Sequence, residues 1–145
     1  MFEIKLYNDN YKNQIIFVWE KSVRATHNFL IYSDIEYYKK IVLNINFNDM
    51  ITYCLIFKRE VLGFIGINNK KIELLFLSPE IIGKGYGQKL VTFAIKKFGV
   101  DLVDVNEQNI NAIEFYEKMG FIVFERTETD SEGKNYPILK MKLKL

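Results

Sequence analysis

The sequence predicts a mixed α/β domain, and two observations point to this class. Segments rich in β-branched and aromatic residues, typical of strands, alternate with segments whose apolar residues recur at helical spacing. The 145 residues, 49% hydrophobic and 15% aromatic, can bury an ordinary core and exclude a disordered chain. No repeat, low-complexity stretch or linker divides the sequence, so we expect one domain over residues 1–145.

The first half of the chain is predicted to form one strand, two helices and three further strands. Its opening residues alternate between apolar and polar, which is typical of a strand. Ile15, Ile16, Val18 and Trp19 have the spacing of one helix face. A charged turn at residues 58–60 separates two β-rich runs and predicts a hairpin. The predicted elements are strand 2–7, helices 11–23 and 35–43, and strands 51–57, 61–67 and 71–77.

The second half is predicted to alternate helices and strands and to end in a hairpin. Its best helix has Leu90, Val91 and Ala94 on one face, and Gly99 is placed to end it. Asn109 has the side chain of an N-cap for the next helix. Lysines alternate with apolar residues in the last run, which predicts one face in water. The predicted elements are helix 85–98, strand 102–105, helix 109–119, and hairpin strands 121–129 and 138–145 around residues 130–134.

A glycine-rich loop joins a predicted strand to a predicted helix in the stretch from Leu74 to Leu90, LLFLSPEIIGKGYGQKL. Glycines at 83, 85 and 87 let the backbone approach a ligand closely and leave N–H groups pointing outward. These groups precede a helix, whose macrodipole adds positive potential. The loop is therefore predicted to bind phosphate.

Three kinds of phosphate-binding loop compete for this stretch. A mononucleotide P-loop needs Ser or Thr after Gly-Lys, whereas Gly85 follows Lys84 here. A dinucleotide fingerprint needs a third glycine, which both possible registers lack. The third pattern, Gln/Arg-x-x-Gly-x-Gly/Ala, is the pyrophosphate loop of the GNAT superfamily of acetyl-CoA-dependent N-acetyltransferases. Residues 82–87, IGKGYG, resemble it, with Ile82 in place of the usual Gln or Arg.

A second segment strengthens the resemblance to the GNAT superfamily. Residues 106–121, NEQNINAIEFYEKMGF, match the family's N-x-x-A-x-x-x-Y-x-x-x-G-F segment at every anchor, including Asn109 and Tyr116. The predicted order of strands and helices is also the GNAT order, so the resemblance covers essentially the whole chain. It implies the GNAT fold, with a central mixed, mostly antiparallel sheet of six to seven strands flanked by about four helices.

The resemblance also implies acetyl-CoA as the cosubstrate. In this family the strand end, the glycine loop and the second segment together bind it. The expected acetyl-CoA-binding residues are Leu75, Phe76, Leu77, Ile82, Gly83, Lys84, Gly85, Tyr86, Gly87, Gln88, Asn109 and Tyr116.

The resemblance further implies direct transfer of acetyl to a primary amine in a ternary complex. Tyr116 is expected to give a proton to the departing thiolate, although its ring equally suits packing of the helix onto the sheet. A backbone N–H around Phe76 or Leu77 is expected to stabilise the oxygen that becomes negative. Cys54, the only cysteine, is not needed and is predicted to be a small buried hydrophobe.

The sequence leaves the general base open. An alkylammonium acceptor has a pKa near ~10.4, so exposing its lone pair at neutral pH benefits from a positioned base. Glu73 leads because it shares a predicted strand face with Leu75 and because related sequences often carry an acid there. Asp104 and Glu107, which flank the end of the next strand, are further candidates, and transfer without a protein base is the remaining alternative.

A third segment, SVRATHNFL at residues 22–30, resembles the S-V-x-A-T-H-x-F-L stretch of a subgroup of small bacterial GNAT acetyltransferases. That subgroup also shares D-V-N-E-Q-N, found at residues 104–109, and G-K-x-Y-P, found at residues 133–137. In GNAT proteins the region after the first helix walls the acceptor pocket. A lone histidine is often a hydrogen-bonded structural residue, so a structural role stays open beside substrate positioning. The expected acceptor-binding residues are His27, Asn28, Phe29 and Glu107.

Composition limits the remaining partners and cofactors. The net charge of +2 gives no electrostatic argument for nucleic acid or membrane as a partner. One histidine and one cysteine do not make the usual zinc ligand sets, so no metal is expected, and no serine lies in G-x-S-x-G. With no signal-peptide pattern or membrane-spanning run, we expect a cytoplasmic protein.

The expected partner is therefore a small-molecule or peptide amine. Exposed strands in the terminal hairpin are suited to pairing in a homodimer. Because Ile82 departs from the family pattern, a GNAT-fold module that binds acyl-CoA without transfer is the alternative function.

Overall fold

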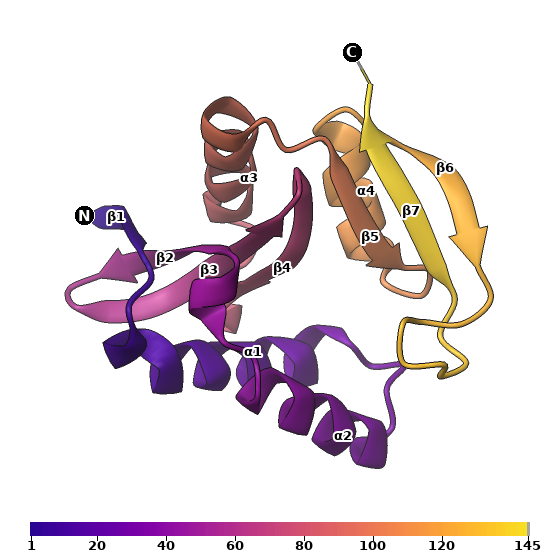
Figure 1. Cartoon of the computed structure of the whole chain (residues 1–145), viewed down its shortest axis with the longest axis horizontal. Helices are drawn as coiled ribbons and strands as arrows, with labels where there is room; N and C mark the ends of the chain where they lie inside the picture. Colours follow the sequence, from indigo (N-terminus) through magenta and orange to yellow (C-terminus); the bar gives the residue numbers. More distant parts are fainter. Residues whose placement is uncertain (145) are drawn as a thin grey trace.

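Seven strands form one sheet in the computed structural model, which describes residues 1–144 (Figure 1). The strand order is β1-β2-β3-β4-β5-β7-β6, and every neighbouring pair is antiparallel except β4 and β5. This architecture confirms the predicted mixed, mostly antiparallel sheet. The strands are β1 (Phe2–Leu6), β2 (Ile51–Phe57), β3 (Glu60–Asn68), β4 (Lys71–Leu77), β5 (Leu102–Asn106), β6 (Phe121–Thr127) and β7 (Ile138–Leu143).

Four α-helices within residues 1–144 cover both faces of the sheet. They are α1 (Lys12–Thr26), α2 (Tyr32–Leu43), α3 (Tyr86–Phe98) and α4 (Ile110–Lys118). Trp19 of α1 belongs to the core on one face, and Leu90 of α3 to the core on the other. Side chains of β3 alternate between the two cores, with Phe64 in the first and Ile65 in the second. None of the helices in this described part is long and apolar enough to cross a membrane.

The first two helices are longer than their apolar spacing predicts, and polar groups account for the additional turns. The last turn of α1 reaches Thr26, whose hydroxyl donates to the carbonyl of Ser22 over 2.7 Å. α2 begins at Tyr32 and carries Asp34 in its first turn, where a negative charge complements the helix dipole. A search for apolar periodicity does not detect such residues.

The strands of the terminal hairpin are shorter than predicted. The carboxylate of Asp130 accepts hydrogen bonds from the main-chain N–H groups of Glu132 and Lys134, over 3.0 and 2.9 Å. The Asp130 carboxylate thus takes the place of a main-chain carbonyl of a neighbouring strand as the acceptor. The loop between the two strands therefore begins before the predicted end of the first strand. β7 ends at Leu143, and Leu145, which the sequence predicts to continue it, lies outside the described residues.

The central strands β4 and β5 separate after a short parallel contact. They pair only at Lys71 with Leu102 and at Ile72 with Val103, and they diverge beyond these positions (Figure 1). The later residues of β4 therefore keep β3 as a ladder partner on one side, while the edge toward β5 is left for other contacts. Main-chain groups along that edge are available to a ligand.

A β-bulge in β4 lies at the point of divergence. Leu74 pairs with Gly66 and Ile72 pairs with Ile67, so Glu73 is an additional residue without a partner in β3. A bulge bends its strand and redirects side chains, and bulges are common beside active sites. This local irregularity brings Glu73 to the widening gap between the two strands.

The loop between β6 and β7 is fastened to α2 by side-chain hydrogen bonds. Tyr38 donates its hydroxyl proton to Asp130, and Tyr136 donates to Asp34. Lys134 also pairs with Asp34 over 2.9 Å. These contacts tie a helix that packs on the β1–β4 half of the sheet to a loop of the β5–β7 half.

We expect Tyr38→Phe to lower the free energy of unfolding by about 1–2 kcal/mol, because the hydroxyl bonds a charged acceptor in a half-buried setting. Burial and the Asp130 carboxylate raise the pKa of Tyr38 above its ordinary value. The contribution should thus be complete below pH ~10, the unfolded pKa, and should disappear as the pH rises through the folded pKa. Chemical denaturation of both proteins at several pH values measures it.

Tyr37→Phe is the matched control for this prediction. The Tyr37 hydroxyl donates to Glu132 over 2.9 Å at the exposed surface, so its loss should change the free energy of unfolding much less than the loss of the Tyr38 hydroxyl. Equal losses in the two variants would contradict the proposed fastening through Tyr38.

Candidate active site

A cavity of about 460 Å³ occupies the space where β4 and β5 diverge. Its wall is built from the end of α1, the strands β4 and β5, the glycine loop and α4. It therefore brings together segments that are far apart in the sequence. The predicted site residues that line it are His27, Glu73, Leu75, Phe76, Leu77, Ile82, Gly83, Gly85, Gly87, Gln88, Asn109 and Tyr116.

Some predicted site residues lie outside this cavity. Lys84 and Tyr86 do not line it, and the ring of Tyr86 packs against Phe2 with centroids 4.0 Å apart. Asn28 and Phe29 line a second cavity of about 430 Å³, which shares part of its wall with the first. Their assignment to acceptor binding stays a prediction.

The glycine loop has the backbone conformation that its sequence predicts. Gly83 and Gly85 have φ of +80° and +89°, in the left-handed region that favours glycine. A Cβ atom added to either glycine would meet nothing within 4 Å, so the loop surface is open at both positions. Gly85 is the N-cap of the 13-residue α3 and has no side chain to occupy the helix N–H groups. The loop thus offers free N–H donors at the positive end of a helix.

Gly87 has a different role from the other two glycines. A Cβ atom there would lie 3.3 Å from two ring carbons of Phe115, so its absence allows α3 to approach α4 closely. Ile82 lines the cavity with its side chain 43% exposed, and its extended backbone leads into the loop.

Two acidic side chains line the cavity. Glu73 reaches it from the β4 bulge, and its side chain is exposed there. Asp104 reaches it from β5, but Lys71 holds its carboxylate in an ion pair of 2.6 Å. Among residues 1–144, Glu73 is consequently the cavity acid that has no cationic partner.

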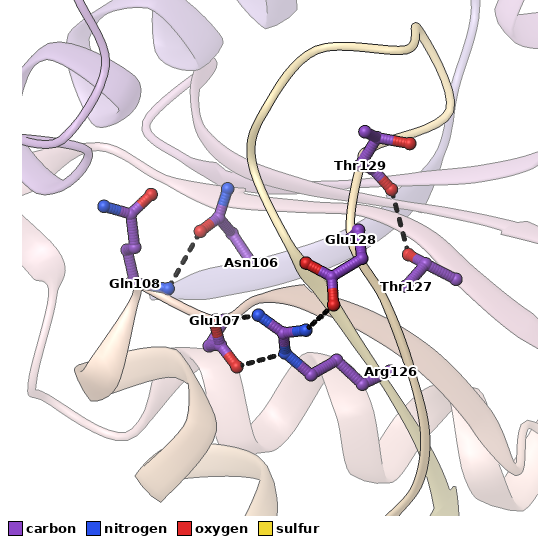
Figure 2. Close-up of polar contacts among 7 residues, drawn as sticks. All are labelled: Asn106, Glu107, Gln108, Arg126, Thr127, Glu128 and Thr129. Atoms are coloured by element: carbon purple, nitrogen blue, oxygen red, sulfur yellow. Dashed lines mark hydrogen bonds and ion pairs between the residues drawn. The ribbon is translucent and has the colours of Figure 1, made fainter.

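Glu107, the other acid predicted for the site, is not brought to the cavity. Figure 2 shows its carboxylate beside the guanidinium of Arg126, with hydrogen bonds of 2.6 and 3.1 Å. Arg126 also donates to Glu128 over 2.6 Å. The Arg126 hydrogen bond lowers the pKa of Glu107, which makes this carboxylate a weaker base.

The helix α4 positions two residues of the second sequence segment. Asn109 is the N-cap, and its side-chain oxygen accepts from the N–H of Ala112 over 3.2 Å. Tyr116 is only 6% exposed and packs edge-on against Phe115 and Phe121, with centroids 5.0 and 5.5 Å away. Burial raises the pKa of the Tyr116 phenol, which therefore stays protonated at neutral pH.

His27 closes the cavity from the end of α1. The ring lies between the aromatic side chains of Phe29 and Phe76, with centroid distances of 5.3 and 6.4 Å. Burial lowers the pKa of His27 to about 4, so the imidazole is neutral at physiological pH. The ring is therefore packed against aromatic side chains and also lines the cavity, and its role in substrate positioning stays a prediction.

Several wall residues were not predicted from the sequence. The polar and aromatic ones are Ser22, Thr26, Asn106, Asn111 and Phe115. The first two are the S and T of S-V-x-A-T-H-x-F-L, and Asn106 lies in D-V-N-E-Q-N. The motif segments therefore contain further wall residues beside the ones that the sequence analysis selected from them.

Comparisons with known proteins identify the family and the fold. Residues 28–145 match the family described as "Acetyltransferase (GNAT) domain". The chain is 32% identical to the peptidyl-lysine N-acetyltransferase YjaB of Salmonella typhimurium over 141 residues, 97% of each protein. The solution structure of apo-form YjaB from Escherichia coli is 29% identical, with a TM-score of 0.89, covering 98% of this chain and 97% of that one.

A more distant structure is the PaiA N-acetyltransferase of Thermoplasma acidophilum, solved in complex with coenzyme A. It has a TM-score of 0.74 at 24% identity and covers 98% of this chain and 99% of that one, a likeness of fold. The family match covers most of the chain and confirms the predicted enzyme class, an acyltransferase. The chain therefore belongs to the GNAT acetyltransferase family.

Proposed function

We propose that this protein transfers the acetyl group of acetyl-CoA to the side-chain amine of a lysine in a peptide. The observation that carries the proposal is the single cavity shared by the glycine loop, the unpaired edge of β4, Glu73 and Tyr116. Lysine as the acceptor is supported by two relatives that are named peptidyl-lysine N-acetyltransferases. Family membership supports acetyl-CoA as the acyl donor.

The residues present fit this cosubstrate. Free N–H groups around Gly83 and Gly85 would hold the pyrophosphate, since the loop is open there and precedes a helix. The unpaired β4 edge from Leu75 to Leu77 would hold the amide-containing arm, because its main-chain groups lack a partner strand on that side. Bound acetyl-CoA supplies an acyl group that is activated as a thioester.

Residues of the cavity then provide the proton transfers. Glu73 takes a proton from the ammonium of the acceptor, directly or through water, and so frees the nitrogen lone pair. Deprotonation of the alkylammonium acceptor costs roughly 4–5 kcal/mol at neutral pH, and a positioned base lowers this cost. The nitrogen bonds to the carbonyl carbon as the carbon–sulfur bond breaks, and an N–H near Phe76 stabilises the oxygen. Tyr116 gives its hydroxyl proton to the departing sulfur, and the second proton that the new amide nitrogen loses restores the phenol, directly or through water.

The release of free thiol from acetyl-CoA tests the proposed function. A terminally blocked lysine peptide, free lysine and a polyamine are compared as acceptors, and we expect the peptide to give the fastest release. Binding of CoA is measured in parallel by calorimetry. If CoA binds and no acceptor gives thiol, the function is that of a non-catalytic acyl-CoA-binding module.

Gly85→Ala tests the part of the proposal that concerns cofactor binding. An alanine at φ +89° costs about 1–2 kcal/mol, and relaxation of that strain would turn loop N–H groups away from the phosphates. We therefore expect the Kd for CoA to rise about tenfold. Gly133→Ala is the matched control, because Gly133 has φ +75° in the distant β6–β7 loop. The prediction is wrong if both variants bind CoA with the same Kd.

A further inference from the structure

His27 lies in a short hydrogen-bonded chain at the end of α1. Its Nδ1 atom is 2.7 Å from the hydroxyl oxygen of Thr26. That oxygen is also 2.7 Å from the main-chain carbonyl of Ser22. Ser22, Thr26 and His27 all line the main cavity.

The two distances decide where the imidazole proton lies. The carbonyl of Ser22 has no proton, so the hydroxyl of Thr26 must donate to it. A hydroxyl has one proton, and Thr26 can then only accept from the ring. Nδ1 of His27 therefore carries the proton in the neutral imidazole, and Nε2 carries the lone pair.

The Nε2 atom of His27 is not enclosed in the core. Within residues 1–144, no buried side-chain nitrogen or oxygen lacks a hydrogen-bond partner. The hydrogen bond that the structure gives this ring is made through Nδ1, so Nε2 is not sealed in the core. The ring belongs to a residue that lines the main cavity, so this open acceptor lies beside the space proposed for the reaction.

We propose that Nε2 of His27 accepts a hydrogen bond from the attacking primary amine, and that Thr26 is a positioning residue that fixes the tautomer required for this contact. The inference rests on the proposed function and names what recognises the acceptor nitrogen. A primary amine that attacks through its lone pair keeps two N–H donors, and each needs an acceptor in an enclosed site. His27 supplies one of them. Burial, which keeps the ring neutral, prevents repulsion of an incoming ammonium.

The tautomer can be measured directly because His27 is the only histidine of the chain. In a ¹⁵N NMR correlation spectrum at neutral pH, we expect Nδ1 at the protonated position and Nε2 at the unprotonated position. Thr26→Val should mix the two tautomers, whereas Thr26→Ser keeps the hydroxyl and should preserve the wild-type pattern. A wild-type spectrum with the proton on Nε2 would overturn the proposal.

Amine contact is tested on the same spectrum without turnover. Titration of n-butylamine into the CoA complex should shift the Nε2 resonance upfield, as expected for an acceptor that gains a hydrogen bond. No shift at amine concentrations that occupy the site, judged by other cavity resonances, would overturn the contact. This readout does not need acetyl transfer, so its failure differs from failure of the proposed function.

Two substitutions of the histidine separate substrate contact from a structural role. In His27→Asn the amide nitrogen can still donate to Thr26, but no acceptor remains at the Nε2 position. In His27→Gln the amide reaches the Nε2 position and loses the Thr26 contact. We expect His27→Asn to raise the KM for a blocked lysine peptide about 3- to 10-fold, with the Kd for CoA unchanged, and His27→Gln to raise it less. The reverse order would show that the bond to Thr26 is the only role of the ring.

Discussion

Replacement of Tyr116 by phenylalanine is expected to lower kcat about 10²-fold or more while the Kd for CoA stays near the wild-type value. The variant keeps the ring, which packs against Phe115 and Phe121, and removes only the hydroxyl. Because burial raises the pKa of Tyr116, the phenol stays protonated at neutral pH. A phenol with a raised pKa is a weak acid. It gives its proton to the departing thiolate only because the same apolar surroundings also destabilise the charge on the sulfur.

The measurement for Tyr116→Phe is single-turnover thiol release, with calorimetry for CoA binding. Tyr38→Phe serves as the control, because it removes a tyrosine hydroxyl that lies outside the cavity, and its kcat should equal the wild-type value. Full turnover in Tyr116→Phe would leave the ring with a packing role and would transfer the proton donation to water.

Replacement of Glu73 by glutamine is the second large effect that we expect. The variant keeps the size of the side chain on the β4 bulge and removes its basicity, so kcat/KM at neutral pH should fall about 10²-fold. The loss should shrink as the pH rises toward ~10, because the lysine acceptor with a pKa near ~10.4 then arrives deprotonated without help. A profile of kcat/KM against pH for both proteins measures this convergence.

Variants of the other two candidate acids test whether Glu73 is the general base. Asp104 lines the cavity but is paired with Lys71, and Glu107 is paired with Arg126 outside it. We therefore expect smaller losses in Asp104→Asn and Glu107→Gln than in Glu73→Gln. A larger, pH-dependent loss in either variant would move the role of base to that residue. If all three variants have the wild-type profile of kcat/KM against pH, transfer proceeds without a protein base.

Sequence patterns predicted the elements well where apolar periodicity or glycine marked them. The helix that ends at Gly99 and the N-cap Asn109 are found as expected, with φ +66° at the glycine and a hydrogen bond from Ala112 to the asparagine. The first two helices extend beyond their apolar stripes because residues such as Thr26 make polar contacts there. Periodicity carries no information on such contacts.

The site was predictable by residue type and less so by arrangement. The bulge that redirects Glu73 depends on the register between β3 and β4, which no local pattern specifies. The partner of Glu107 is Arg126, 19 residues further along the chain and brought near by the β5–β7–β6 order. The tautomer of His27 depends on two distances of a few ångströms, which only coordinates provide.

The most direct test of the account is a quenched-flow reaction of the protein with acetyl-CoA and a blocked lysine peptide, analysed by intact mass. We predict that acetylated peptide appears at the rate at which free thiol appears. We also predict that no acetylated form of the protein rises and decays during turnover, because Cys54 is buried and the cavity wall includes no cysteine. An acetyl-protein species that forms and disappears fast enough to account for turnover would contradict direct transfer.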